Sequence, residues 1–419
     1  MESMDRWIWI SGFRRSKSQE FDEEWKKPGK NSQKVVLISE KTEDQEHSED
    51  GKMRQRKQES LGKEGQMEYL HGGDIEAYSQ ENMLDYSVNI HPFGPCPEVV
   101  EAVIQSVRTQ TSRYPDPFCR KLRKRLANRW EIPEESLILG NGAAELIFLL
   151  VQTLRPKKGF LIAPSFAEYR RALESVKCEI RWFELEEEKE FRLTKDYLNG
   201  LTEDLEIAFL CSPDNPSGQR IPEKLLDQII EKCEKQKIFL VLDESFLEFT
   251  EQGRRWSKCA WAAEHPGILV LRSFTKIQGI PGLRLGYGVS GDSRLAEAME
   301  GKRQPWSVST VAQAAGIASL EYGEEWAYKA RNLIWEEKPR LEAALEKAGM
   351  KVYPGEADFL FFRGREDLQE RLLGKGILIR DCSDYPGLSK GYFRIAVKKP
   401  EENERLIQAL EEIGKEDNG

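Results

Sequence analysis

The chain has 419 residues, a formal net charge of -9 and seven cysteines. This length is typical of two or three domains, or of one large domain with an appendage. A negative net charge argues against broad electrostatic binding to nucleic acid. No apolar run approaches the ~20 residues of a membrane helix, and residues 7–10 are too short an apolar patch for a signal-peptide core. The scattered cysteines include no C-x-x-C pair, which argues against a disulfide framework or a metal site. We therefore expect a soluble cytoplasmic protein.

Residues 1–66 differ in composition from the rest of the chain, because Lys, Glu, Asp, Gln and Ser dominate them. Such a segment buries too little apolar surface to offset its ordering entropy, so we expect a disordered N-terminal extension. Ordinary globular composition begins at Met67. We expect residues 67–96 to form an N-terminal arm that reaches the substrate.

Between residues 97 and 300, short apolar runs alternate with segments of helical periodicity. The expected helices are 97–110, 118–130, 143–154 and 222–236. The expected strands are 136–139, 159–163, 179–185, 207–211, 238–243 and 268–273. This alternation predicts an α/β fold, with a mostly parallel sheet covered by helices on both faces of a large domain at 97–300.

The pattern changes after residue 300. Two long helices are expected at 308–322 and 324–348. The remaining expected elements are strands at 350–353, 359–362, 377–379 and 391–396 and a last helix from Pro400. We therefore expect a smaller C-terminal α+β domain at 301–419.

A lysine follows the last strand of the predicted parallel sheet. The neighbours of Lys276 include Ser273, Thr275 and Arg284. The carboxyl edge of an open α/β sheet is where ligands bind, and two hydroxyls with a guanidinium suit a phosphate group. An amine beside such cations has a lowered pKa and can form a Schiff base. The alternative for a lone lysine is a solvated loop residue.

Three other strand ends carry candidate ligands. Asp243 ends a very apolar strand, where a carboxylate needs a cationic partner such as a protonated pyridine nitrogen. A helix N-cap or a structural ion pair explains it equally well. Gly142, Ala143 and Ala144 form a turn whose amides can hold a phosphate at a helix N-terminus, or a plain tight turn. Asn215 stands between two prolines that fix its direction, although an ordinary turn has the same pattern.

In this order and spacing, the four segments resemble the aspartate-aminotransferase-type (fold type I) enzymes that use pyridoxal 5'-phosphate (PLP). The resemblance runs from about Met67 to the C-terminal helix. It implies that Lys276 binds PLP covalently, Asp243 pairs with the pyridine nitrogen and Asn215 contacts the ring oxygen. The residues that it implies for the cofactor phosphate are Gly142, Ala143, Ala144, Ser273, Thr275 and Arg284.

Two aromatic residues also match positions of this family. Phe166 stands where a ring stacks on the cofactor. Tyr114 stands where a tyrosine reaches the phosphate bound by the other subunit, so the resemblance implies a homodimer with shared active sites. For either residue alone, core packing is the alternative.

Within this family, several segments are similar to threonine-phosphate decarboxylases, and the cofactor residues are shared with histidinol-phosphate aminotransferases. Phe246 replaces a tyrosine that is usual in the aminotransferases, and His91 replaces a usual asparagine. The substrate contacts that the resemblance implies are His71, Gly72, Asn89, Asn215, Arg380 and Arg394.

The expected reaction is decarboxylation of O-phospho-L-threonine to (R)-1-aminopropan-2-yl phosphate and CO2, for the cobalamin nucleotide-loop linker. PLP weakens the Cα bond that stands perpendicular to its ring, so the arginines select the reaction by selecting a rotamer. The alternatives are an aminotransferase of the histidinol-phosphate type and a decarboxylase that prefers O-phospho-L-serine. A non-catalytic DNA-binding regulator is disfavoured, because residues 1–66 contain no helix-turn-helix pattern.

Overall fold

The computed structural model describes residues 72–78 and 82–416. All of them belong to one unit, Tyr69–Gly419. The extension expected at 1–66 and the candidate residue His71 lie outside the described residues. Among the helices of the described ranges, none combines the length and apolar character that a bilayer crossing requires.

The main sheet has seven strands in the order β2-β8-β7-β6-β5-β3-β4. The strand β8 runs antiparallel to both of its neighbours, β2 and β7, and the other neighbouring pairs of this sheet are parallel. The bounds of the strands are β2 Leu137–Gly140, β3 Lys158–Ala163, β4 Glu179–Glu184, β5 Ile207–Cys211, β6 Phe239–Asp243, β7 Ile268–Ser273 and β8 Gly286–Val289. The predicted, mostly parallel sheet is confirmed.

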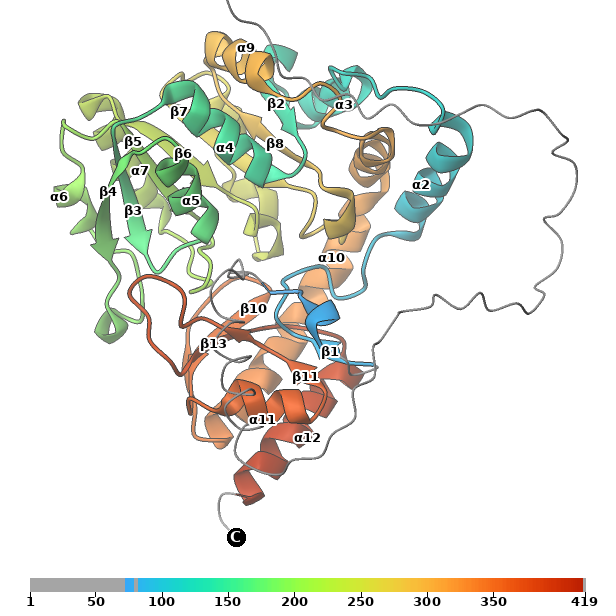
Figure 1. Cartoon of the computed structure of the whole chain (residues 1–419), viewed down its shortest axis with the longest axis vertical. Helices are drawn as coiled ribbons and strands as arrows, with labels where there is room; N and C mark the ends of the chain where they lie inside the picture. The colour runs from blue at the N-terminus through green and yellow to red at the C-terminus, as the bar shows by residue number, and fades with distance from the viewer. Residues whose placement is uncertain (1–71, 79–81, 417–419) are drawn as a thin grey trace, which may run out of the picture. The chain divides into compact units, whose positions relative to one another are not determined.

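Both faces of this sheet are buried, because successive side chains of each strand enter different apolar clusters. In β6, Val241 belongs to one cluster, whereas Leu240 and Leu242 belong to the other. Figure 1 shows α4 and α5 in front of the sheet. Helices with residues in the cluster of Val241 include α4 Ala143–Leu154, α5 Ala167–Ser175 and α9 Ser293–Lys302. Those in the other cluster include α2 Pro97–Gln110, α3 Arg120–Trp130, α7 Glu223–Gln236 and α8 Cys259–Ala262.

A second, antiparallel sheet follows in the C-terminal part of the chain, with the order β12-β13-β10-β9. Its strands are β9 Lys351–Tyr353, β10 Phe359–Arg363, β12 Arg380–Asp381 and β13 Tyr392–Ala396. The helices α11 Leu368–Gly374 and α12 Pro400–Glu416 accompany it, as expected for an α+β region. The arm strand β1 Leu84–Asp85 pairs with β11 Ile377–Leu378, which brings the N-terminal arm to this part of the molecule.

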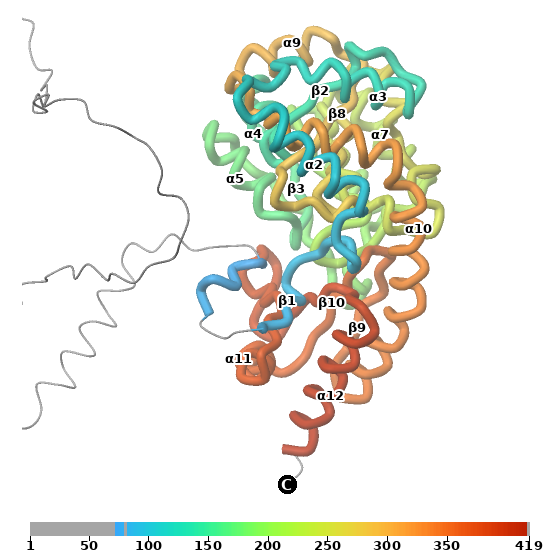
Figure 2. The backbone as a smooth tube through the Cα atoms, turned by 90° about the vertical axis from the view of Figure 1, so that its right-hand side faces the viewer, coloured from blue at the N-terminus to red at the C-terminus, as the bar shows by residue number. Residues whose placement is uncertain are grey.

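The two helices expected at 308–322 and 324–348 are one helix, α10 Thr310–Lys347. The expected break at Gly323 is wrong, because this glycine serves close packing inside the helix. A Cβ atom there would lie 2.2 Å from the side-chain oxygen of Gln278. Figure 2 shows that α10 extends from the height of α3 down to that of α12. Residues of α10 contribute to both apolar clusters. The division into domains at residue 300 stays a prediction.

Candidate active site

A cavity of about 490 Å³ lies at the carboxyl ends of β5, β6 and β7. This volume is within the range of small-molecule and cofactor sites. Its walls come from the main sheet, the N-terminal arm and the C-terminal sheet. The predicted site residues that line it are Gly72, Asn89, Ala143, Ala144, Phe166, Asn215, Asp243, Ser273, Thr275, Lys276, Arg284, Arg380 and Arg394.

Lys276 follows β7; hydrogen bonds hold its backbone, and its amine has no hydrogen-bond partner among the described residues. Its carbonyl oxygen accepts hydrogen bonds from the amides of His91 at 3.1 Å and Gly279 at 3.0 Å. The amine nitrogen lies 5.3 Å from the centre of the Phe246 ring. Burial lowers the pKa of this lysine, and the positive charge of Arg394 lowers it further. A partly buried amine of lowered pKa is a competent nucleophile for an aldehyde.

Asp243 is 4% exposed and is oriented by two donors. The hydroxyl of Tyr169 donates to Oδ2 at 2.8 Å, and the amide of Ser245 donates to Oδ1 at 2.9 Å. Burial raises the pKa of Tyr169 well above its ordinary value, so this phenol keeps its proton and acts as a donor. The carboxylate is therefore fixed at the end of β6, where a cationic ring nitrogen can pair with it.

The N-terminus of α4 forms a cradle with Arg284. Gly142 has φ +85°, and a Cβ atom there would lie 2.6 Å from Nη2 of Arg284. Glycine thus permits the guanidinium to approach the helix N-terminus, although Gly142 itself does not line the cavity. The hydroxyls of Ser273 and Thr275 lie 2.6 Å apart on the same wall. Amides, hydroxyls and a guanidinium together match a phosphate group.

Arg394 is held firmly on the side of the cavity that belongs to the C-terminal sheet. It is 6% exposed, and its Nη1 donates to Oδ1 of Asn215. Its Nη2 donates to the carbonyl oxygen of Ser87 at 2.7 Å. With its carboxamide oxygen turned toward Arg394, Asn89 accepts from Nη1 and Nε, both at 3.2 Å. The guanidinium is preorganised for an anion in the cavity.

Arg380 reaches the same cavity with a carboxylate already bound to it. Its Nη2 donates to both oxygens of Asp384, at 2.9 and 2.7 Å. Its guanidinium carbon lies 5.2 Å from the centre of the Tyr385 ring. An anionic ligand group that uses Arg380 must share it with Asp384 or displace this carboxylate.

Two predicted aromatic residues have different surroundings. The ring of Phe166 lines the cavity and packs edge-on against Tyr169, with ring centres 5.5 Å apart. Tyr114 does not line the cavity of its own chain; it is 79% exposed and stacks on Trp306 at 4.5 Å. The structure therefore brings Phe166 to the site and leaves Tyr114 at the surface.

The sequence did not single out several residues that the cavity contains. Among them are Ser87, Tyr169, Cys211, Ser245 and Tyr385. Tyr169 had a signal, because it lies in the first turn of the helix that directly follows Phe166. The others are polar or aromatic residues whose position depends on tertiary packing.

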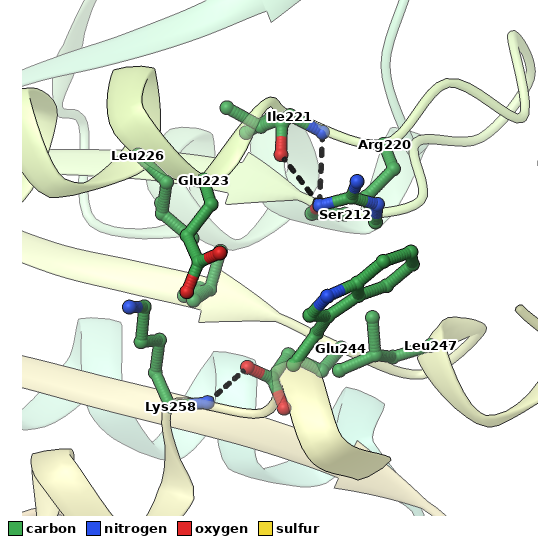
Figure 3. Close-up of a pocket in the computed structure, with 10 residues that line it drawn as sticks. Ser212, Arg220, Ile221, Glu223, Leu226, Glu244, Leu247 and Lys258 are labelled. Carbon is green, nitrogen blue, oxygen red and sulfur yellow. Dashed lines mark hydrogen bonds between the residues drawn. The ribbon is translucent and has the colours of Figure 1, made fainter. Parts of the chain in front are cut away.

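The reverse side of the site is closely packed. Glu244 points away from Asp243, to the opposite face of the sheet, where the amide of Lys258 donates to it at 2.8 Å. Figure 3 also shows the amide of Ile221, which donates to Oγ of Ser212 at 3.1 Å. The pocket between them measures about 10 Å³, room for one water molecule at most. These contacts fix the strand ends that carry the cavity residues.

The Aminotransferase class I and II family model matches residues 81–410 of the chain. The chain belongs to this family. It is 38% identical over 353 residues to threonine-phosphate decarboxylase of Salmonella typhimurium, covering 82% of this chain and 96% of that protein. It is 32% identical over 362 residues to histidinol-phosphate aminotransferase of Symbiobacterium thermophilum, covering 82% and 94% respectively.

Solved structures of this family have the same fold. The histidinol-phosphate aminotransferase of Clostridium acetobutylicum superposes with a TM-score of 0.74 and 27% identity, over 80% of this chain and all of that one. The L-threonine-O-3-phosphate decarboxylase of Porphyromonas gingivalis gives a TM-score of 0.71 at 23% identity, with the same coverage of this chain and 100% of the other. The predicted fold type I architecture is confirmed.

PLP is the cofactor of this family, and the residues of the cavity fit it. The cradle between Gly142 and Arg284 has space only because position 142 lacks a Cβ atom. Asp243 lies in the same cavity, its carboxylate already oriented, and Lys276 presents a free amine there. These groups match the phosphate, the pyridine nitrogen and the aldehyde of PLP.

Proposed function

We propose that this protein is a PLP-dependent decarboxylase of O-phospho-L-threonine. The products are CO2 and (R)-1-aminopropan-2-yl phosphate, for the linker of the cobalamin nucleotide loop. The observation that carries the proposal is the presence of Arg380 and Arg394 in the cavity of Lys276, in addition to the cradle arginine. A phosphorylated amino acid has two anionic groups, and each suits one of these guanidinium groups. The 38% identity to a threonine-phosphate decarboxylase supports the same substrate.

Bound PLP supplies an electron sink for the charge that develops at the substrate Cα. The protein decides which bond at Cα is broken. Arg394 is preorganised by Asn215 and Ser87, and it fixes one anionic group of the substrate. Together, Arg380 and Arg394 would fix the rotamer of the substrate carboxylate, and this rotamer would decide whether CO2 or a proton is lost. A preference of ~1.4 kcal/mol for this rotamer already gives a tenfold bias.

Lys276 then holds the proton that replaces CO2 at Cα. Its amine lies in the same cavity and makes no hydrogen bond to another residue of the described ranges that would compete for this role.

Phe246 lies beside the amine of Lys276 and has no hydroxyl group, so the ring oxygen of PLP lacks the usual tyrosine donor. The oxygen of Asn215 accepts from Tyr385 at 3.3 Å, which leaves the Asn215 amide nitrogen to donate to PLP.

The test uses the purified protein loaded with PLP. We expect O-phospho-L-threonine to yield CO2 and the amine phosphate in equal amounts. O-phospho-L-serine is assayed in parallel, because one methyl group is worth only about 1–3 kcal/mol of discrimination. Histidinol phosphate with 2-oxoglutarate tests the aminotransferase alternative. Oxo-acid-dependent loss of the amine, without CO2, would refute the decarboxylase.

A homodimer with shared sites belongs to the same proposal. Tyr114 is 79% exposed on its own chain, which suits a residue that reaches the cavity of a second copy. Mixed dimers of Tyr114→Ala and Lys276→Ala chains would then regain one intact site, whereas separate sites would give no recovery.

We also propose an N-terminal arm at 67–96 and domains at 97–300 and 301–419. The same proposal includes a cytoplasmic location, because the seven cysteines are free thiols.

A further inference from the structure

Asp358 is a buried carboxylate without hydrogen bonds at its side chain. It is 0% exposed, and neither Oδ1 nor Oδ2 has a hydrogen-bond partner in the described residues. It directly precedes β10, where its backbone oxygen accepts from the amide of Val397 at 2.8 Å. A carboxyl group in this environment is costly when ionised unless cations lie nearby, and it otherwise keeps its proton.

The cations that face Asp358 are Lys276, Arg394 and Lys338. Two of these cations already donate hydrogen bonds to other groups. The amine of Lys338 donates to the carbonyl oxygens of Gly355 at 2.6 Å and Ala357 at 2.9 Å. Arg394 is bound to Asn215 and Ser87 at the cavity wall. Lys276 is the cation of this group whose charge changes during the reaction, because its amine exchanges between cofactor and solvent.

Aromatic contacts connect the amine of Lys276 with Phe359, the residue that follows Asp358. The amine nitrogen of Lys276 lies 5.3 Å from the centre of the Phe246 ring. That ring packs edge-on against Phe359, the residue after Asp358, with centres 5.3 Å apart. Asp358 is fully buried and Lys276 is partly buried, so water screens the interaction between the two charges only weakly.

We propose that Asp358 is the counter-charge of Lys276 and a positioning residue for its proton. Asp358 is a carboxylate when the Lys276 amine is protonated, and a carboxylic acid when that nitrogen is neutral. The substrate ammonium group loses a proton when it replaces Lys276, and Asp358 takes this proton. Asp358 then passes it to the released amine of Lys276, which gives it to the substrate Cα in place of CO2, so Asp358 returns to the carboxylate. Burial supports this exchange, because it raises the pKa of Asp358 and lowers the pKa of Lys276.

The proton route rests on the proposed decarboxylation, but the counter-charge is tested without substrate. The other charges that act on Lys276 are Arg394, Arg284 and Asp243, and none of them changes in Asp358→Asn. The absorbance of the Lys276-bound cofactor is titrated with pH in the holoenzyme. We expect the midpoint to fall by about 1 pH unit in Asp358→Asn, the scale of coupling between interacting sites. The kcat is expected to fall about tenfold with little change in KM.

Asp214→Asn is the matched control. Asp214 is 3% exposed and its Oδ1 also lacks a partner in the described residues. Burial raises the pKa of Asp214 to about 7, but it is not among the charges with the largest effect on Lys276. We expect this variant to keep the wild-type midpoint. An equal shift in both variants would show a general effect of lost buried charge and would overturn the proposal.

Asp358→Ala is titrated alongside, because the added amide of Asn could itself disturb folding. Thermal unfolding of each variant identifies the folded ones. A wild-type midpoint in either folded Asp358 variant would overturn the role of Asp358. Wild-type protein that releases no CO2 would refute the proposed function instead, and the spectroscopic titration would still decide the counter-charge.

Discussion

Acidification should destabilise the fold through His91, whose backbone amide is hydrogen-bonded to Lys276. His91 is 1% exposed and stacks on Trp326 with ring centres 5.5 Å apart. The amide of Phe93 donates to its Nδ1 at 3.1 Å, so Nε2 carries the proton and donates to the carbonyl oxygen of Trp326 at 3.0 Å. These contacts hold the neutral ring, because protonated Nδ1 would face another donor.

The size and sign of this loss of stability follow from the pKa of His91. Burial lowers the pKa of His91 from 6.5 to about 4. Below about pH 6.5 the unfolded chain binds a proton at His91 that the folded chain does not. The free energy of unfolding therefore decreases as the pH is lowered from about 6.5 to about 4. At about pH 5 the unfolded-state ring is roughly thirtyfold more protonated than deprotonated, which corresponds to about 2 kcal/mol of lost stability relative to about pH 8.

Urea unfolding of wild-type protein and His91→Asn at the two pH values measures this loss. Other titrating groups act equally in both proteins, so the comparison isolates residue 91. We expect the wild type to lose about 2 kcal/mol more than the variant on acidification. An equal loss in both proteins would refute the reasoning. The effect reaches the active site, since the amide of His91 donates to the carbonyl oxygen of Lys276 at 3.1 Å.

Three substitutions test the cavity. Gly142→Ala places a Cβ atom 2.6 Å from Arg284 Nη2, so the Kd for PLP, measured by fluorescence titration, should rise about tenfold or more. Tyr169→Phe removes the donor to Asp243 at 2.8 Å, a bond to a charged group worth about 1.5–3 kcal/mol. We expect a shifted cofactor absorbance and weaker PLP binding, and unchanged spectra would contradict this role. Arg394→Lys loses the planar guanidinium, and kcat/KM for phosphothreonine should fall roughly tenfold or more, whereas PLP affinity stays unchanged.

The sequence predicts the main sheet well, because buried parallel strands and amphipathic helices have strong periodic signals. The expected helices at 97–110 and 143–154 and strands at 207–211 and 268–273 have the observed bounds. The candidate site residues Lys276, Asp243 and Asn215 lie at or just after the ends of strands. The order of the strands along the chain therefore predicts that these three residues share one edge of the sheet.

Features that depend on distant packing were not predictable. Gly323 reads as a helix break, and only the close approach of Gln278 shows why α10 continues through it. Leu84 pairs with Ile377, a contact that no local pattern indicates. The burial of Asp358 has the same origin, because a carboxyl group before a strand is ordinarily exposed.

The most direct test of the account follows carboxyl-labelled O-phospho-L-threonine through wild-type protein and Lys276→Ala, both supplied with PLP. We expect the wild type to release the label as CO2 in step with the amine phosphate, with no requirement for an oxo acid. The variant should release label no faster than PLP alone. Label retained in an oxo-acid product, or undiminished release by Lys276→Ala, would contradict the account.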